Sequence, residues 1–436
     1  MQYYTTNNKN SRITLETAVI SGLASDNGLY MPEIIKPLPT SFFENIENLS
    51  LQEIAFEVAK NFFGEDVETD ELKAIVYDSL NFDIPLVKVE ENIYSLELFH
   101  GPTLAFKDVG ARFMSRMLAY FIKKQNSTKD VVNVLVATSG DTGSAVANGF
   151  LGVDGIHVYV LYPKGKVSPI QECQFTTLGQ NITALEVDGT FDDCQSLVKT
   201  AFLDKELNAA MKLTSANSIN VARFLPQAFY YFYAYAQLKK ISPSAAENLV
   251  VCVPSGNFGN LTAGLFAART GLPIKRFIAA NNRNDVFFDY LKTGNYNPRS
   301  SVATLANAMD VGAPSNFARI LDLYQSSHEA ISAEISGATY NDEQISETII
   351  DCLKSTSYQL EPHGACGYKA LKDGLHENET GIFLETAHPA KFKDTVEKII
   401  GKEIEIPAVL HKFMKGKKQS VEIGKGFEEF KRFLMG

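Results

Sequence analysis

Short apolar runs alternate with amphipathic segments along most of this 436-residue chain. From residue 91 onward the pattern predicts buried strands at 131–137, 156–162, 182–187, 249–253, 277–280 and 382–384. Helical spacing of apolar residues follows several of these runs, at 144–150, 192–202 and 261–268. The alternation predicts an α/β protein with a mainly parallel sheet covered on both faces. In such folds ligands bind at the carboxyl ends of the strands.

Residues 1–90 follow a different pattern, which predicts a helical region. Apolar residues have helical spacing at 15–23 and at 66–80. Between these segments, Ser50 is placed to cap a further helix, with Glu53 three residues later as in a capping box. We expect irregular structure with short helices at 281–345, where the periodic signal is weak.

Length and charge limit the classes of function. A chain of 436 residues is expected to form two or three domains. Hydrophobic residues make up 45% and charged residues 21%, which is typical of a globular protein. The net charge of −10 argues against a nucleic-acid partner, because phosphate backbones need a basic surface. No apolar run approaches the roughly 20 residues of a membrane span, so no membrane partner is expected.

The cysteines and histidines bear on the cellular compartment and on metal binding. The five cysteines are odd in number and contain no CxxC pair, and the N-terminus lacks a signal-peptide pattern. We therefore expect a reduced, cytoplasmic compartment. The seven histidines show no HExxH or other metal-ligand spacing, so no metal site is predicted.

One lysine, Lys107, stands at an unusual place. It follows an apolar segment with a Gly101-Pro102 turn and precedes a stretch with helical periodicity, so it is predicted near a helix start. Apolar neighbours and the positive end of a helix both disfavour the ammonium form. A neutral amine there is nucleophilic and can form a Schiff base with an aldehyde. The alternative is a lysine whose amine simply extends into solvent.

Two glycine-containing loops follow predicted strands. The stretch Ser255-Gly-Asn-Phe-Gly-Asn260 can aim backbone N–H groups inward at a helix start, which forms a cup for phosphate. It is neither a Walker loop nor a GxGxxG motif. Ser139-Gly-Asp-Thr-Gly143 is a second such cup, suited to a carboxylate. Its alternative interpretation is a helix start capped by an Asp or Ser side chain.

Thr386 is a further candidate residue, because it follows the last predicted strand. A hydroxyl there can hydrogen-bond a ring nitrogen without protonating it; the alternative is a threonine whose hydroxyl bonds to the backbone. One lysine, two anion cups and a hydroxyl at strand ends match pyridoxal phosphate and an amino-acid substrate. They offer partners for the aldehyde, the phosphate, the ring nitrogen and the substrate carboxylate.

The order and wording of these motifs resemble the threonine synthase family of fold-type-II pyridoxal-phosphate enzymes, from end to end. The stretch 14–32 is similar to the family's N-terminal signature. His-Gly-Pro-Thr-Leu-Ala-Phe-Lys-Asp at 100–108 is similar to its cofactor-lysine motif, and 139–143, 217–220 and 255–260 also match. The chain length resembles the longer, bacterial and fungal type.

The resemblance implies two mainly parallel sheet domains of tryptophan-synthase-β-like architecture, plus the helical N-terminal region. Residues 1–90 would be the N-terminal domain and residues 91–436 the catalytic region. Within the latter, a smaller, mobile subdomain would span about 96–215. The remainder would be the larger cofactor subdomain.

The resemblance also implies roles for the candidate residues. Lys107 would carry the Schiff base and shuttle protons, and Thr386 would pair with the pyridine nitrogen. The cofactor phosphate would be held by Gly256, Asn257, Phe258, Gly259 and Asn260.

The remaining candidates would face the substrate, O-phosphohomoserine. The substrate carboxylate and the cofactor hydroxyl would lie among Ser139, Asp141 and Thr142. Candidates for the second phosphate are Lys164, Asn217 and Arg223.

The activity implied is that of a carbon–oxygen lyase, which converts O-phosphohomoserine and water to threonine and phosphate as the last step of threonine biosynthesis. A monomer or homodimer is expected. One rival is another fold-type-II enzyme, such as a serine/threonine dehydratase or a cysteine synthase, which would need no second cation pocket. Another is a catalytically silent relative that binds metabolites or a partner, with cofactor absorbance but no turnover.

Overall fold

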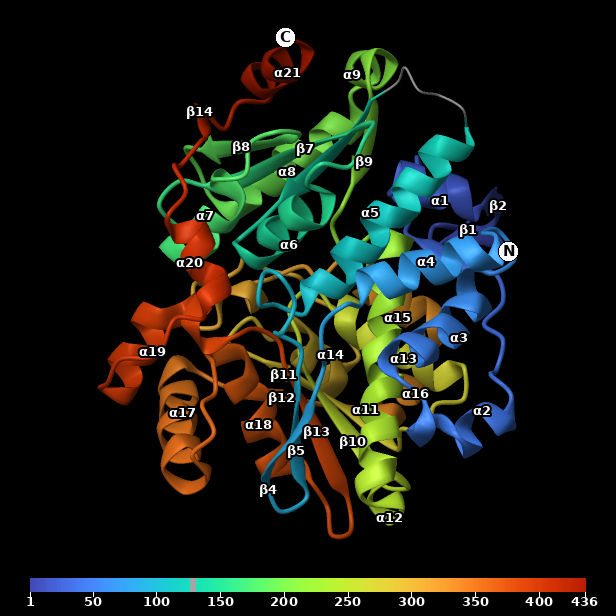
Figure 1. The fold of residues 1–436 in the computed structure, drawn as a ribbon, viewed down its shortest axis with the longest axis vertical. Coiled ribbons are helices and arrows are strands. Elements are labelled where there is room, and N and C mark those ends of the chain that lie inside the picture. Colours follow the sequence, from blue (N-terminus) through green and yellow to red (C-terminus); the bar gives the residue numbers. More distant parts are fainter. Residues whose placement is uncertain (126–130) are drawn as a thin grey trace. The chain divides into compact units, whose positions relative to one another are not determined.

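The computed structural model describes residues 1–125 and 131–436, which divide into two compact units (Figure 1). Unit 1 comprises residues 1–33, 107–223 and 406–436, and unit 2 comprises residues 34–106 and 224–405. Residues 1–90 contribute 1–33 to unit 1 and 34–90 to unit 2. The functional domain boundaries given above stay a prediction.

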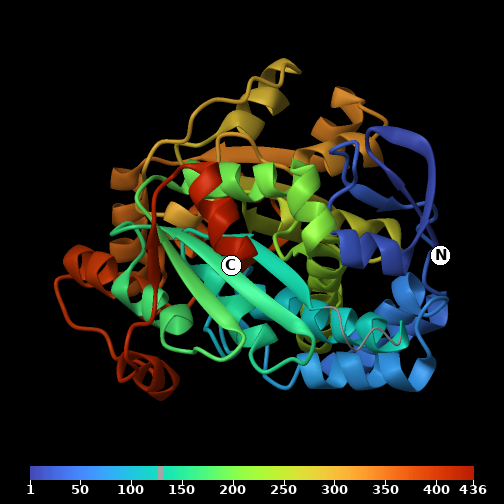
Figure 2. The same ribbon diagram turned by 90° about the horizontal axis from the view of Figure 1, so that it is seen from above.

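A five-stranded parallel sheet in the order β14-β8-β7-β6-β9 forms the centre of unit 1 (Figure 2). Its strands are β6 (Val132–Ala137), β7 (Ile156–Pro163), β8 (Ile182–Val187), β9 (Lys212–Ser215) and β14 (Val421–Ile423). The three longest were predicted and are confirmed. Every residue of β6 is buried, as a strand covered on both faces requires.

The helices of unit 1 are α1 (Leu15–Ser21), α5 (Lys107–Lys124), α6 (Asp141–Phe150), α7 (Pro169–Thr176), α8 (Phe191–Leu203), α9 (Lys205–Ala210), α10 (Val221–Phe224, which ends in unit 2), α20 (Ala408–Met414) and α21 (Phe427–Met435). A small antiparallel sheet is formed by β1 (Gln2–Thr5) and β2 (Asn8–Thr14), which precede α1, and β3 (Tyr30–Pro32), which follows it. The helical region expected at residues 1–90 thus also contains these three strands and β4 (Leu86–Glu90). Asn220 ties this region to unit 1, because its Nδ2 donates to Val19 O at 2.9 Å.

Unit 2 has a six-stranded sheet in the order β12-β11-β10-β13-β5-β4, parallel except for the β4–β5 pair. Its strands are β4 (Leu86–Glu90), β5 (Ile93–Glu97), β10 (Leu249–Pro254), β11 (Arg276–Asn281), β12 (Ile335–Thr339) and β13 (Thr380–Glu385). The predicted strands at 249–253, 277–280 and 382–384 are confirmed. They form the buried centre of the sheet.

The α-helices of unit 2 are α2 (Thr40–Glu44), α3 (Leu51–Phe63), α4 (Thr69–Ser79), α11 (Ala228–Ile241), α12 (Pro243–Ala246), α13 (Gly259–Arg269), α14 (Val286–Thr293), α15 (Phe317–Leu323), α16 (His328–Glu334), α17 (Asp342–Thr356), α18 (Pro362–Gly374) and α19 (Lys393–Ile400). Short 3₁₀ turns are η1 (Ile46–Asn48), η2 (Leu225–Gln227), η3 (Asn307–Met309) and η4 (Pro389–Phe392). The capping box of Ser50 and Glu53 is confirmed.

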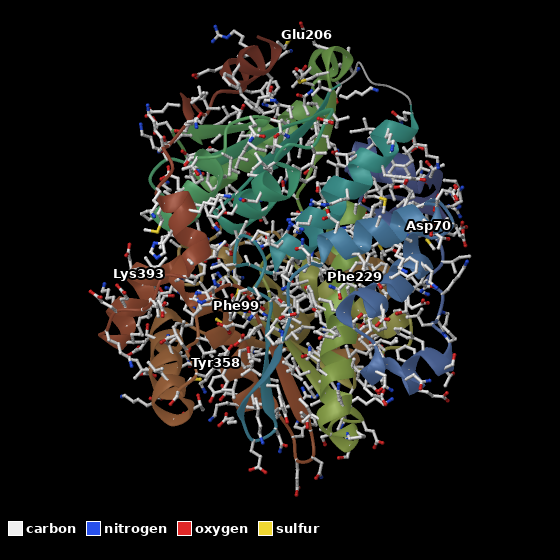
Figure 3. All side chains as sticks on the ribbon, in the orientation of Figure 1. Asp70, Phe99, Glu206, Phe229, Tyr358 and Lys393 are labelled. Atoms are coloured by element: carbon white, nitrogen blue, oxygen red, sulfur yellow. The ribbon has the colours of Figure 1, made fainter. Side chains whose placement is uncertain are left out.

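Buried aromatic residues form part of the interior of unit 2. Helix α11 is apolar on nearly all sides, and it packs against α3 and α13. Its Phe229 is buried, and Tyr358 lies below and to the left of it in Figure 3. The Tyr358 hydroxyl lies 2.9 Å from both Ser95 Oγ and Glu97 Oε1, so its hydrogen-bonding partners lie on strand β5.

Within residues 1–125 and 131–436, no helix combines the length and apolar character that crossing a membrane takes.

Two glycines of α18 make a matched test of this packing. A Cβ on Gly364 would lie 1.7 Å from Glu385 Oε2, whereas one on Gly374 would make an ordinary 3.4 Å contact with Ile278 Cδ1. Gly364→Ala should therefore lower the free energy of unfolding by about 1–3 kcal/mol, a typical cost of overpacking. Gly374→Ala should be neutral or slightly stabilising, because alanine is the better helix former. Urea denaturation of both variants checks this; equal effects would contradict the packing described.

Candidate active site

The loop at 255–260 has the predicted strand–loop–helix arrangement. Strand β10 ends at Pro254 and helix α13 begins at Gly259. The N-cap residue, Phe258, is left-handed with φ 61° and its own side chain makes no capping hydrogen bond, while Asn260 Oδ1 accepts from Leu261 N at 3.0 Å. The first N–H groups of an α-helix have no partners within the helix, so this start offers donors and a positive dipole to an anion.

Hydrogen bonds fix both ends of this loop. Ser255 N donates to Ala280 O at 2.9 Å, and Asn281 Nδ2 donates to Ser255 O at 3.0 Å. At the other end, Asn260 Nδ2 donates to Pro254 O at 2.9 Å. The loop is thereby tied to the adjacent strand β11 and to its own strand, so its backbone donors are held in place before any ligand binds.

Gly256 is a position where the loop tolerates no side chain. A Cβ there would lie 2.9 Å from both Ala308 O and Met309 Cα, which are backbone atoms of η3. The close approach explains the first glycine of the predicted motif by packing rather than by backbone angle. Turn η3 thus closes one side of the loop.

Thr386 directly follows β13, the neighbour of β10 in the sheet. The two strands are parallel, so Thr386 and the 255–260 loop lie at the same edge, on strands about 4.8 Å apart. The Thr386 hydroxyl, which is buried, donates to Glu361 Oε1 at 3.4 Å. That separation is long for an O–H···O bond, so the hydroxyl proton can turn to another acceptor.

Glu361 was not found from the sequence, and it is the polar group directly behind Thr386. Its carboxylate accepts hydrogen bonds from His363 N (2.9 Å), His363 Nδ1 (2.5 Å) and Gly364 N (2.8 Å) as the N-cap of α18. Burial, reinforced by Glu361, raises the pKa of neighbouring Glu385 well above its ordinary value. This shift favours the neutral carboxyl form of Glu385. The only sequence signal was a glutamate before a helix-starting proline.

In unit 1, the 139–143 loop joins β6 to α6. Thr138 Oγ1 accepts hydrogen bonds from Gly140 N (2.9 Å) and Gly143 N (2.8 Å), and Gly140 has φ 140°. The alternative that an Asp or Ser side chain caps this helix is wrong, because the N-cap residue is Gly140. Asp141 is instead buried and accepts a hydrogen bond from Gln171 Nε2 at 2.8 Å.

Lys107 is the first residue of α5 and is half-buried, as the helix-start prediction required. The buried Arg223 reaches it, because Arg223 Nη1 donates to Lys107 O at 2.9 Å and Nε to Ala216 O at 2.7 Å. Gly110 makes this approach possible, since a Cβ there would lie 2.3 Å from Arg223 O. Burial, partly offset by Asp108, lowers the pKa of Arg223 to about 10, so Arg223 stays charged at neutral pH.

The other two candidates of unit 1 follow strands that flank β6. Asn217 comes after β9, and its Nδ2 donates to Ala137 O at 3.2 Å at the end of β6. Lys164 comes after β7, is exposed, and forms an ion pair with Glu422 at 2.7 Å. The hydrogen bond that Lys164 Nζ donates to Glu422 raises the pKa of Lys164. The structure thus brings Lys107 and Arg223 together, and Asn217 to the loop of β6, while Lys164 is engaged at the surface.

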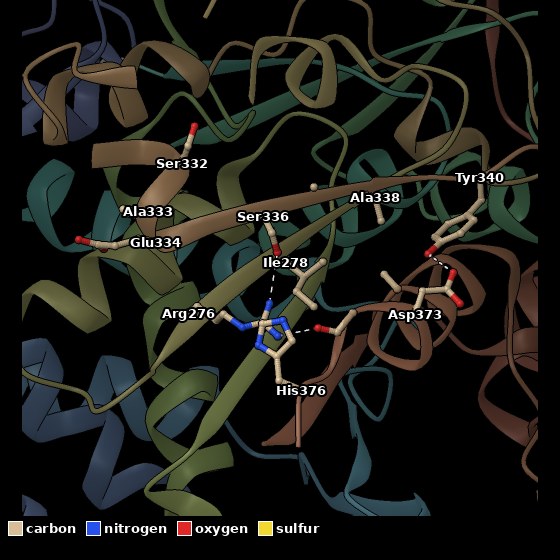
Figure 4. A pocket seen from close by; sticks show the side chains of 13 residues that line it. Arg276, Ile278, Ser332, Ala333, Glu334, Ser336, Ala338, Tyr340, Asp373 and His376 are labelled. Carbon is tan, nitrogen blue, oxygen red and sulfur yellow. Dashed lines mark hydrogen bonds between the residues drawn. The ribbon is translucent and has the colours of Figure 1, made fainter. Parts of the chain in front are cut away.

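One cleft described in unit 2 lies away from these residues. Figure 4 shows this cleft of about 370 Å³, lined in part by Arg276, Ser336 and His376. Arg276 begins β11, so the cleft reaches the amino end of that strand, whereas the 255–260 loop and Thr386 follow the carboxyl ends. None of the predicted site residues lines it. Among the described residues, no group of three or more His, Cys, Asp or Glu side chains could hold a metal ion.

The donor set suits a phosphorylated aldehyde with an aromatic nitrogen. Unit 2 offers a helix start for phosphate and a hydroxyl at the next strand end, and unit 1 offers an amine at a helix start. Taken unit by unit, these are donors of the kind that a pyridoxal-phosphate-dependent enzyme of fold type II needs. The family model "Pyridoxal-phosphate dependent enzyme" matches residues 81–384, and models of the threonine synthase N terminus and C-terminal region match 2–80 and 364–434.

Full-length relatives specify the family. The threonine synthase of Haemophilus influenzae is 46% identical over the whole of both chains. The crystal structure of threonine synthase from Escherichia coli has a TM-score of 0.93 and 41% identity, covering 100% of this chain and 99% of that one. The PLP-bound threonine synthase of Brucella melitensis has a TM-score of 0.92 and 33% identity, with the same coverage. The chain belongs to the threonine synthase family.

Gly256 gives a direct test of the phosphate loop. In Gly256→Ala the added methyl group would press on the Ala308 carbonyl and Met309 Cα, so the loop backbone has to move. We expect the dissociation constant for pyridoxal phosphate to rise at least tenfold, measured by fluorescence titration. Gly374→Ala, in the same unit, is the control with unchanged affinity. An equally unaffected Gly256→Ala would exclude this loop from phosphate binding.

Proposed function

We propose that this protein catalyses the threonine synthase reaction, in which O-phosphohomoserine and water become threonine and phosphate. It would act as a carbon–oxygen lyase on a phosphate ester and supply the last step of threonine biosynthesis. The observation that carries the proposal is the full-length similarity to threonine synthases, with Lys107 at the start of α5. Five cysteines without a disulfide in the described part of the chain support a cytoplasmic location.

In this proposal each of the two loops at strand ends, 255–260 and 139–143, binds one anionic group. The helix start at Gly256, Asn257, Phe258, Gly259 and Asn260 holds the cofactor phosphate, and Thr386 pairs with the pyridine nitrogen. The bound cofactor supplies an electron sink for carbanion chemistry at the substrate α carbon. The substrate carboxylate binds at the start of α6, among Ser139, Asp141 and Thr142.

Lys107 is the proposed acid–base group and the residue that binds the cofactor aldehyde. Its amine takes the proton from the α carbon and returns protons later, while phosphate leaves the γ carbon and water adds at the β carbon. The covalent chain supports its place, because Phe106, the residue before it, donates from its N–H to Thr386 O at 2.9 Å. Lys107 thus follows directly on the segment held at the Thr386 strand end.

The leaving phosphate of the substrate needs cations and hydrogen-bond donors, and the proposed groups are Lys164, Asn217 and Arg223. Arg223 is charged, buried and bonded to the Lys107 carbonyl, so it can also fix the start of α5. Lys164 would have to exchange Glu422 for phosphate, which an exposed ion pair permits at low cost. The monomeric or homodimeric state stays a prediction.

Substrate comparison tests the proposed activity. The enzyme should release phosphate from O-phosphohomoserine and form threonine in equal amounts, measured by phosphate assay and amino-acid analysis. Keto-acid formation from serine or threonine without phosphate release would instead indicate a dehydratase. Cofactor binding with no turnover of any of the three would indicate a silent relative.

Lys107→Ala should lose activity by roughly a hundred- to ten-thousandfold, the usual size of a general acid–base contribution. The cofactor should still bind through its phosphate, but less tightly. Lys123→Ala, in the last turn of the same helix, is the matched control and should keep full activity. Normal turnover by Lys107→Ala would contradict the role given to this lysine.

A pair of surface lysines tests the second phosphate site. Lys164→Ala should raise KM for O-phosphohomoserine severalfold and leave cofactor affinity intact, because only a substrate contact is removed. Lys166→Ala, two residues away and also exposed, controls for the change in net charge. If both variants show the same KM at low salt, Lys164 does not bind the substrate.

A further inference from the structure

The largest fully buried side chain described in the protein is that of Arg319, on α15. Its relative exposure is 0%. The guanidinium carbon lies 4.0 Å from the centre of the Phe224 ring, and Nη1 donates to Asn316 Oδ1 at 2.6 Å. Taking a guanidinium out of water is costly, so its surroundings have to be organised around it. Its position therefore fixes the groups that it contacts.

The contact with Arg319 decides which way the Asn316 amide faces. A guanidinium can only donate hydrogen bonds, so the oxygen of the Asn316 amide has to point toward Arg319. Its Nδ2 then points the other way and donates to Asn257 O at 3.0 Å. Because the donor is charged, it also polarises the amide and strengthens the second bond. Asn316 is itself fully buried.

Asn257 belongs to the 255–260 loop and is held at two points. Its carbonyl accepts from Asn316, and its side-chain Oδ1 accepts from Ser315 N at 2.6 Å. The carbonyl of Asn257 and the N–H of Phe258 belong to one planar, trans peptide and point in opposite directions. Holding the carbonyl toward Asn316 therefore aims the Phe258 N–H away from α15.

Phe258 is the N-cap of α13 and has φ 61°, a left-handed conformation that costs roughly 1–2 kcal/mol for an L-residue. Such a conformation persists only where the surroundings enforce it. The ring of Phe258 packs on Phe287 at 4.7 Å between centroids, which holds the side chain. The bonds from Asn316 hold the preceding peptide.

We propose that Arg319 is a positioning residue for the phosphate-binding loop, acting through Asn316 on the Asn257–Phe258 peptide. The inference rests on the proposed function, because it takes the 255–260 loop as the binding site of the cofactor phosphate. Arg319 does not contact the cofactor in this account. It determines how well the loop donors are aimed before the phosphate arrives.

Two variants each remove one of the two contacts, that of Arg319 with Asn316 and that of Asn316 with Asn257. Arg319→Met keeps most of the volume and removes the donor to Asn316. Asn316→Asp keeps an acceptor for Arg319, and with it a buried ion pair, but its carboxylate cannot donate to Asn257 O. Both should raise the dissociation constant for pyridoxal phosphate at least tenfold, or about 1.4 kcal/mol, and shift the ³¹P resonance of the bound cofactor. At saturating cofactor, kcat should fall much less than the affinity.

Arg269→Met is the matched control. Arg269 ends the same helix α13, lies over the Tyr324 ring at 4.7 Å and forms an ion pair with Glu334. It should change thermal stability without changing cofactor affinity or the ³¹P resonance. If Arg319→Met does not fold, Asn316→Asp decides alone, since it retains the charge pairing.

The outcomes separate this inference from the proposed function. If the unaltered protein fails to bind pyridoxal phosphate, the proposed function is wrong whatever the variants do. If the unaltered protein binds it and Asn316→Asp binds it equally well with the same ³¹P resonance, only the role of Arg319 and Asn316 is overturned. A loss of affinity equal in Arg269→Met would likewise overturn it, because the effect would then be one of general stability.

Discussion

Both units depend on one constraint: the first backbone N–H groups of a helix have no carbonyl partner within that helix and need another acceptor. Each unit places such a start directly after a buried parallel strand, α13 after β10 and α6 after β6. Side chains accept from some of these N–H groups: Thr138 Oγ1 accepts from Gly140 N and Gly143 N at the start of α6, and Asn260 Oδ1 accepts from Leu261 N at the start of α13. A helix start at the carboxyl edge of a sheet, with its positive dipole end, favours an anionic ligand.

The backbone N–H groups at these helix starts keep one orientation only if the loops around them are rigid. Buried polar contacts make these loops rigid. In unit 2 the loop is fixed by Asn281, by Asn316 and by the close approach of η3 to Gly256. In unit 1, Gln171 holds Asp141, and Gly110 lets Arg223 reach the backbone of Lys107. These residues form a second layer behind the predicted binding groups. Their contacts explain how the 255–260 and 139–143 loops can keep the same backbone geometry when no ligand is bound.

The central strands and the glycine loops were readable from the sequence because both leave local signals. Six-residue apolar runs such as Val132–Ala137 can only be buried, and a glycine-rich turn before a helical pattern marks a strand end. Strands β9 and β12 were missed because they are short and less apolar. Glu361, Asn316 and Arg319 were missed because their importance arises from contacts far along the chain from the motifs. Lys164 could be placed at a strand end, but its pairing with Glu422 depends on the tail strand β14.

The central claim is that Lys107 binds the cofactor aldehyde, and one labelling experiment tests it most directly. Borohydride reduction of the enzyme with bound pyridoxal phosphate should fix the cofactor to the protein. Proteolysis and mass spectrometry should then locate the label on the peptide that contains Lys107, with Lys107 itself modified in near-unit yield. A label spread over surface lysines, or placed at any single other lysine, would contradict the account.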